Sequence, residues 1–222
     1  MSFNRQVLYT CRVLWNRGPM PNTSNTRGAS RDPRARRTRA LLRSAVLDLS
    51  MEKDLDGITM GDIAERAEVN RATVYLHYKD REDLLLDATE STMDGVVEAA
   101  RACRLISDTH TLPDTAPVHL VGLFAQVDKH RAVYRRMLGE DGSPRFAARL
   151  EQRLAQAWFE QLLAEASPDA CDETALLVRA HFLSGALLAV VGRWVRGEFE
   201  GENGMSMAEL TEVTWALIRG RG

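Results

Sequence analysis

The chain has 222 residues, of which 45% are hydrophobic and 27% charged, a composition typical of a globular protein that buries a core. Its three cysteines, Cys11, Cys103 and Cys171, lie far apart without a CxxC pair, which argues against a disulfide scaffold and favours a reducing compartment. No charge-free apolar stretch reaches the roughly 18 residues of a membrane span. We therefore expect a cytoplasmic protein without a membrane partner.

The net charge of −2 conceals an uneven distribution. Residues 1–50 contain ten arginines and two aspartates, whereas the rest of the chain carries 19 basic and 29 acidic residues. A basic end on an acidic body indicates that this end meets a polyanion. A solvated basic tail would give the same pattern, so charge alone leaves both interpretations open.

The first part of the chain divides into a tail and a helix. Residues 1–33 show no sustained hydrophobic period and are interrupted by Gly and Pro, so we expect a mobile tail. A helix is predicted over residues 35–52, where apolar side chains recur three and four positions apart. These side chains are Leu41, Leu42, Ala45, Val46 and Leu49.

Three capping signals mark the next helices. Thr59 followed by Asp62 resembles a capping box and predicts a short second helix. Asn70 is a favourable N-cap for a third helix from Arg71 to about residue 78. Asp80 begins a fourth helix, which we expect to continue to about residue 104.

The remainder also shows helical periodicity, and we find no strand pattern. We expect one helix over residues 118–138, a second that starts near Pro144 and ends before Pro168, and a third over 172–197. Between residues 180 and 195 this third helix is apolar almost all round, which indicates a buried or interface element. A last helix contains Leu210, Val213, Leu217 and Ile218.

The two short helices joined at Glu68-Val69-Asn70 form a predicted helix-turn-helix over about residues 59–78, a motif whose second helix enters the major groove of DNA. Residues 35–85 closely resemble the DNA-binding head of the tetracycline-repressor (TetR) family. The segments that carry this resemblance are Gly57-Ile58-Thr59, Asp62–Ala67, Val69 and Thr73–Leu85. The rest of the chain is similar to the family only in length and helical pattern.

Two positions depart from the family pattern. Glu68 stands where the family usually has Gly, and a positive φ there would cost a non-glycine residue on the order of 1 kcal/mol. Asn70 replaces the usual Ser or Thr cap of the recognition helix and caps equally well.

The candidate DNA-binding residues follow from the chemistry of base and phosphate recognition. At the start of the recognition helix, Arg71 can pair with guanine and Ala72 can touch a thymine methyl group. The resemblance implies that Thr73, Tyr75 and His77 face phosphates or groove edges, with Lys79 and Arg81 at phosphates near the fourth helix. The caps Thr59 and Asn70 complete the set.

Plainer structural roles stay open for several of these residues. Tyr75 could be a core aromatic residue and His77 a capping or packing residue, whereas Val74 and Tyr78 belong in the core. The arginines ahead of the first helix either follow DNA or form a solvated arm. They are Arg34, Arg36, Arg37 and Arg39.

The chain lacks the sequence signatures of the common enzyme classes and metal sites. The five histidines form no i, i+4 pair and no HExxH motif, and the chain has no GxSxG, P-loop or dinucleotide fingerprint. We therefore expect no catalytic residue, no metal site, no cofactor and no enzymatic activity.

The body is expected to sense a ligand and to dimerise. An effector pocket, or alternatively plain core, is predicted from Phe124, Met137, Trp158, Phe159, His181, Phe182 and Trp194. A dimer interface on the last two long helices, resembling the family's four-helix dimer bundle, is predicted from Leu183, Leu187, Leu188, Val191, Leu210, Val213 and Leu217.

We thus expect an all-α chain: a three-helix helix-turn-helix head is joined by a fourth helix to a larger helical bundle. The expected domains are a tail over 1–33, a DNA-binding domain over 34–80 and a ligand-binding and dimerisation domain over 81–222. The expected function is that of a homodimeric transcriptional repressor that binds palindromic double-stranded operator DNA and is released by a small apolar effector. An all-α enzyme or ligand carrier, and an architectural binder that ignores sequence, are the alternatives.

Overall fold

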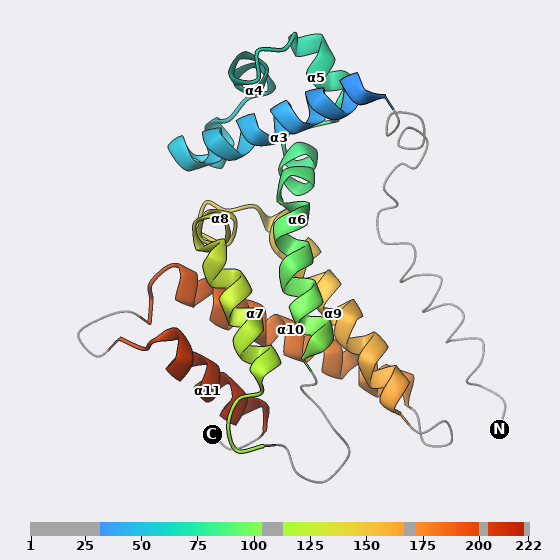
Figure 1. The fold of residues 1–222 in the computed structure, drawn as a ribbon, viewed down its shortest axis with the longest axis vertical. Coiled ribbons are helices and arrows are strands. Elements are labelled where there is room, and N and C mark those ends of the chain that lie inside the picture. Colours follow the sequence, from blue (N-terminus) through green and yellow to red (C-terminus); the bar gives the residue numbers. More distant parts are fainter. Residues whose placement is uncertain (1–31, 104–112, 167–171, 200–203, 220–222) are drawn as a thin grey trace, which may run out of the picture. The chain divides into compact units, whose positions relative to one another are not determined.

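The computed structural model describes residues 32–103, 113–166, 172–199 and 204–219, and within these ranges the regular structure is entirely helical (Figure 1). The all-α prediction is confirmed. The chain forms two compact units, residues 1–41 and 42–222, which are described separately. The elements are α3 (Pro33–Glu52), the 3₁₀ turn η1 (Leu55–Gly57), α4 (Met60–Arg66), α5 (Arg71–His77), α6 (Arg81–Ala102), α7 (Val118–Lys129), α8 (Arg131–Met137), α9 (Pro144–Glu165), α10 (Glu173–Val195) and α11 (Met207–Ile218).

In the first unit, the described residues are the opening turns of α3. Asp32 begins the helix: its carboxylate accepts a hydrogen bond from the Arg34 N–H at 2.9 Å, and its carbonyl accepts one from the Arg36 N–H at 3.1 Å. All four arginines of the predicted basic arm therefore lie within α3, and their placement ahead of the helix was wrong. The rest of the predicted tail, residues 1–31, lies outside the described residues.

The helices α4 and α5 share an apolar core with the later turns of α3. Fully buried side chains come from each of them: Leu42 and Val46 of α3, Ile63 of α4 and Val74 of α5. Tyr78, directly after α5, is also buried and donates a hydrogen bond to the Asp87 carboxylate of α6. The expected core positions of Val74 and Tyr78 are confirmed.

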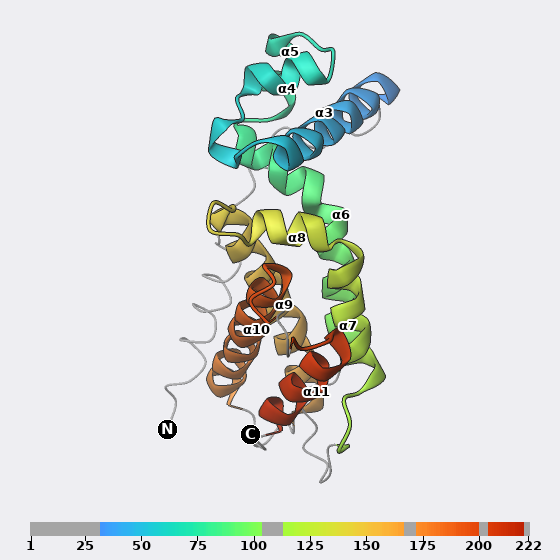
Figure 2. The same ribbon diagram turned by 90° about the vertical axis from the view of Figure 1, so that its left-hand side faces the viewer.

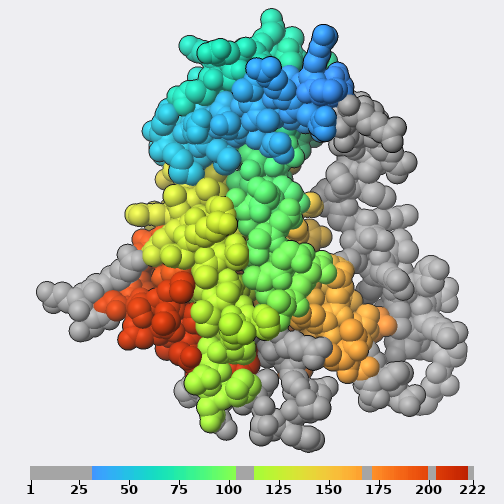
Figure 3. Space-filling view, in the orientation of Figure 1, coloured from blue at the N-terminus to red at the C-terminus, as the bar shows by residue number. Residues whose placement is uncertain are grey.

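The helices α6 to α11 form the larger bundle. The α6 helix packs against both α7 and α9, and α10 runs along α9 (Figures 1 and 2). The α11 helix lies beside α7, on the face turned to the viewer in Figure 3. Large aromatic side chains fill the interior, namely Phe124, Tyr134, Phe146, Trp158, Trp194 and Trp215.

The single helix expected over residues 118–138 is two helices. His130 leaves helical geometry with φ −119° and ψ 27°, so it ends α7 and begins α8. The chain turns there, and Tyr134 of α8 then packs edge-on against Phe146 of α9 at 6.0 Å between ring centroids. Both segments are amphipathic, which is why periodicity alone did not reveal the break.

The α10 helix is long and apolar enough to cross a membrane by length and composition alone. One third of its most apolar window is buried within the chain itself. The same composition is typical of a helix that packs on both sides in a helical protein, and the buried side of α10 faces α9.

Candidate nucleic-acid interface

A reciprocal capping box fixes the start of α4. The Thr59 side chain accepts a hydrogen bond from the Asp62 N–H at 3.1 Å, and the Thr59 N–H donates to the Asp62 carboxylate at 2.8 Å. The Lys53 ammonium also contacts this carboxylate at 2.8 Å, and together with Thr59 it lowers the pKa of Asp62 to about 2. The predicted capping box is therefore present, with Thr59 exposed at the helix start.

The turn between α4 and α5 is tight. Glu68 adopts a positive φ of 54°, and the next residue, Val69, donates its N–H to the Ala64 carbonyl at 3.0 Å. The departure noted in the sequence thus coincides with the position where a residue without a side chain fits best. Glu68 accepts this backbone strain at the centre of the helix-turn-helix.

The α5 helix is capped at its N-terminus and held by two buried side chains. The Asn70 carboxamide oxygen accepts a hydrogen bond from the Ala72 N–H at 2.8 Å. Val74 is buried in the middle of the helix and Tyr78 is buried at its end. These contacts fix which side of α5 faces outward.

The outward side of α5 carries most of the predicted DNA-contacting residues. Arg71 and Ala72 are exposed at its first two positions, and 51% of Tyr75 is accessible, so Tyr75 is not a core aromatic residue. Thr73 and His77 are half-buried at the flanks. The Arg71 guanidinium lies over the Tyr75 ring, 5.9 Å from its centroid, so this pair forms one amphipathic surface.

Leu76 was missed by the sequence analysis. Its side chain is 75% exposed on the same side of α5, and exposure of an apolar side chain to water does not stabilise the fold. Its only sequence signal was its position between Tyr75 and His77, which periodicity would assign equally well to the core. An exposed leucine on a recognition helix has the chemistry to contact a thymine methyl group.

Lys79 and Arg81 differ in their surroundings, although both were expected to meet phosphates. Lys79 is exposed. The Arg81 guanidinium turns back into the protein, donates to the Leu55 carbonyl and pairs with Asp56 at 3.2 Å and Glu82 at 3.3 Å. The structure therefore gives Arg81 partners within the chain instead of an open position.

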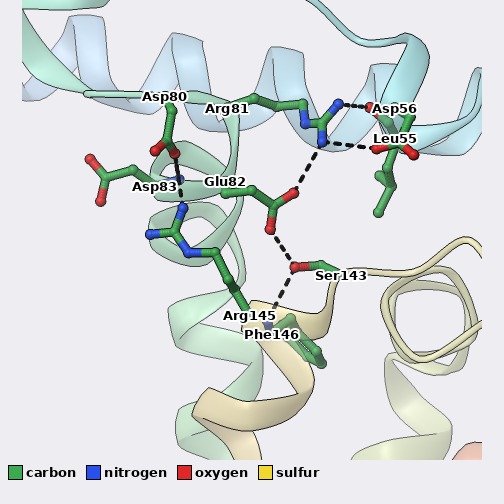
Figure 4. A network of polar contacts seen from close by, with 9 residues as sticks. All are labelled: Leu55, Asp56, Asp80, Arg81, Glu82, Asp83, Ser143, Arg145 and Phe146. Atoms are coloured by element: carbon green, nitrogen blue, oxygen red, sulfur yellow. Dashed lines mark hydrogen bonds and ion pairs between the residues drawn. The ribbon is translucent and has the colours of Figure 1, made fainter. Parts of the chain in front are cut away.

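Arg81 belongs to a polar network between the helix-turn-helix and the bundle, which we call the junction (Figure 4). Glu82 accepts a hydrogen bond from the Ser143 hydroxyl at 2.5 Å, and Ser143 in turn caps α9 by accepting from the Phe146 N–H at 3.1 Å. Arg145 pairs with Asp80, the N-cap of α6, at 3.0 Å. Burial raises the pKa of Asp80, but the Asp83 N–H and Arg145 outweigh it and hold the pKa below its usual value.

The residues expected to line an effector pocket do not come together around one cavity. Phe124, Met137 and Trp158 are buried in the core, where Phe124 packs against Trp194 at 5.7 Å. Phe159 is half-buried, and His181 lies 2.9 Å from a Glu151 carboxylate oxygen. Phe182 is 73% exposed, so its assignment to an interior pocket was wrong.

The predicted dimer residues divide between core and surface. Leu183, Leu187, Val191 and Leu210 are buried within their own chain, which leaves little of these side chains for a partner to contact, and the subunit interface itself stays a prediction. Leu188 is half-buried, and Val213 and Leu217 are exposed as expected. A helix that is apolar on both sides does not reveal from its sequence which side faces its own core.

The exposed side of α10 is also apolar. Small and apolar residues recur there at three- and four-residue spacing, the pattern of a helix that packs against another helix. They are Ala175, Val178, Phe182, Gly185 and Ala189. We call Ala175, Val178 and Phe182 in the first half of this helix, together with Val213 and Leu217 of α11, the apolar face.

Within the described ranges, no group of three or more His, Cys, Asp or Glu side chains is arranged to hold a metal ion.

Comparisons with known proteins agree with this geometry. Residues 42–88 match the family model "Bacterial regulatory proteins, tetR family". The uncharacterized HTH-type transcriptional regulators YxbF and YdeS of Bacillus subtilis (strain 168) are 32% identical over 108 residues and 38% identical over 60 residues. These matches cover 48% and 27% of this chain but only 28% and 30% of the two relatives.

The solved structure of a TetR transcriptional regulator from Streptococcus agalactiae 2603V has the same fold. It superposes with a TM-score of 0.56 at 19% identity, and the match covers 82% of this chain and 94% of that one.

Proposed function

We propose that the chain is a member of the TetR family of bacterial regulatory proteins, and that it is a sequence-specific DNA-binding repressor that acts as a homodimer and responds to a small molecule. The observation that carries the proposal is the outward side of α5. There Arg71, Tyr75 and Leu76 are exposed on a helix held by a capped start and a buried anchor. In the proposed division of the chain, residues 34–80 bind DNA and residues 81–222 sense the ligand and dimerise.

The side chains of α5 suit major-groove reading. Arg71 can donate two parallel hydrogen bonds to guanine, and Ala72 and Leu76 can contact thymine methyl groups. Thr73, Tyr75 and His77 flank these residues toward the phosphates, and Lys79 supplies a phosphate contact. Thr59 and Asn70, exposed at the starts of α4 and α5, have polar side chains that can also meet the phosphate backbone.

The apolar face supports the proposal of a dimer, because a second copy of the chain would cover it. In water, a single chain would leave Val178, Phe182 and Leu217 exposed, and large exposed apolar side chains on the last two helices are what a subunit interface would cover. A two-fold partner presenting the same residues would cover them. Two recognition helices would then face successive major grooves of a palindrome, about 34–36 Å apart or a multiple of that distance.

Selection of bound sequences from random double-stranded DNA tests the proposal. A palindrome with two equal half-sites is the expected result. Enrichment of no consensus, together with a steep salt dependence, would instead identify an architectural binder that ignores sequence. Failure to retain DNA at all would favour an all-α ligand carrier.

A further inference from the structure

A groove of about 480 Å³ lies between the α8–α9 loop and the outer side of the C-terminal half of α10. Leu138, Pro144, Ala147 and Leu188 contribute apolar lining, and Arg193 and Arg196 contribute guanidinium groups. The exposed Glu140 on the loop is its one acidic lining residue. This volume is within the range of small-molecule sites, which are about 300–1,000 Å³.

The two guanidiniums of the groove converge on one carboxylate. Arg193 Nη1 lies 2.6 Å from one oxygen of Glu198, and Arg196 Nε lies 2.6 Å from the other. Glu198 reaches this position because Gly197, just beyond α10, adopts a φ of 84°. Two cations therefore share a single anion, and their spacing fits a carboxylate held from both sides.

We propose that the groove binds a small organic carboxylate, whose charged group pairs with Arg193 and Arg196 and whose apolar part lies against Leu188 and Leu138. Glu198, which does not itself line the groove, is then an internal competitor for the two guanidiniums. The inference rests on the proposed function, since it gives the small-molecule effector a chemical class and a site. It also replaces the interior apolar pocket expected from the sequence.

The guanidiniums are essential to this recognition. The groove lies at the C-terminal end of α10, where the helix dipole places partial negative charge that disfavours an anion. Arg196 also donates from Nη1 to the Leu138 carbonyl at 2.9 Å and so ties the groove to the α8–α9 loop. Arg193, which is more exposed and has only Glu198 as an ion-pair partner among the described residues, is the side chain to test.

The other side of the same loop reaches the junction. Ser143 lines the groove and also donates its hydroxyl to Glu82 at the start of α6 (Figure 4). Gly142 of this loop packs closely on the Met137 carbonyl oxygen, where a Cβ would lie only 2.3 Å away. A ligand that moves Leu138 or Ser143 therefore changes the contact with Glu82 and, through Arg81, with Leu55 beside α4.

Thermal shift assays on the full chain test the site without requiring operator DNA. The probes are octanoate and benzoate, with octanol and benzamide as neutral counterparts. We expect at least one carboxylate to raise the Tm of the wild type, and neither neutral compound to do so. Arg193→Gln should weaken carboxylate binding on the order of tenfold, and Glu198→Gln should strengthen it by a similar factor. Arg135→Gln, an exposed arginine of α8 outside the groove, is the matched control and should bind as the wild type does.

Three results would overturn the proposal: no carboxylate binds either the wild type or Glu198→Gln, neutral compounds bind equally well, or Arg193→Gln binds like the wild type. Sedimentation of Arg193→Gln as a monomer beside a dimeric wild type would also overturn it, by assigning the groove to the subunit contact. DNA retention is measured separately on each variant. Loss of carboxylate binding with intact DNA binding rejects only the groove, whereas a wild type that retains no DNA rejects the proposed function.

Discussion

Arg71 is the first residue of α5, directly after its Asn70 cap, and is held over the Tyr75 ring. Arg71→Ala should therefore reduce affinity for the selected sequence by about 1–3 kcal/mol and affinity for random DNA much less, because a bidentate guanine contact is lost. Lys79→Ala is the matched comparison: it should weaken both kinds of DNA alike and reduce the slope of log K against log salt by about 0.9. Equal losses on both DNAs for Arg71→Ala, measured by fluorescence anisotropy, would make Arg71 a phosphate ligand.

Glu68 carries the backbone strain of the turn. Glu68→Gly relieves about 1–2 kcal/mol of left-handed strain and costs about 0.4–1 kcal/mol in unfolded-chain entropy, so a net gain of about 0.5–1 kcal/mol is expected. Glu65→Gly, an exposed substitution inside α4, should instead destabilise by about 0.5–1 kcal/mol. Urea denaturation distinguishes the two, and a destabilised Glu68→Gly would show that the Glu68 side chain makes a contact worth more than the strain.

At the scale of single residues, local chemistry was predictable and long-range chemistry was not. The caps at Thr59 and Asn70 and the strained position at Glu68 depend on neighbours within a few residues, so the sequence contains all the information that they need. Arg81 lies 26 positions from Leu55, and no local pattern brings the two together. The partners of Arg81 became visible only in the fold.

The start of α6 illustrates how an element is held in place. Arg81 is only 21% exposed and donates to the Leu55 carbonyl, so Arg81→Ala leaves that acceptor and Glu82 with fewer partners. A loss of about 1–3 kcal/mol in the free energy of unfolding is expected. Arg145→Ala removes a half-exposed ion pair at the same junction and should cost less than about 1 kcal/mol.

The same Arg81→Ala variant also separates the two roles considered for this arginine. Its salt dependence of DNA binding should match that of the wild type, because the guanidinium is engaged within the protein. If stability is unchanged and the salt slope falls by about 0.9, Arg81 is a phosphate ligand and the junction contact is incidental.

Among the helices, those with distinct caps and one apolar stripe were predicted within a few residues. For α9, Ser143 and Pro144 mark the start, and the leucines four apart mark the buried side. The boundary between α7 and α8 was missed because His130 is neither Gly nor Pro and the apolar pattern continues through it. The sequence did not distinguish the side of α10 that faces its own core from the side that faces outward, because both sides are rich in small and branched residues.

For the whole molecule, the apolar face is the feature that links fold to function. Phe182→Asp places a charge at its centre and should weaken self-association by at least about 30-fold, since a buried aromatic anchor commonly contributes 2 kcal/mol or more. Val118→Asp changes an equally exposed apolar residue of α7 and should leave the assembly unaffected. Sedimentation velocity over a concentration series measures both, and equal behaviour of the two variants would place the interface elsewhere.

In the proposed function, two copies of the chain read the two halves of one palindrome. The most direct test is a titration of the selected palindrome, and of the same DNA with one half-site scrambled, with oligomeric state measured on each complex. We predict two protomers on the palindrome and an affinity at least about 100-fold lower for the scrambled site, because several base contacts of about 1–3 kcal/mol each are lost. One protomer on the palindrome, or equal affinity for both DNAs, would contradict the account.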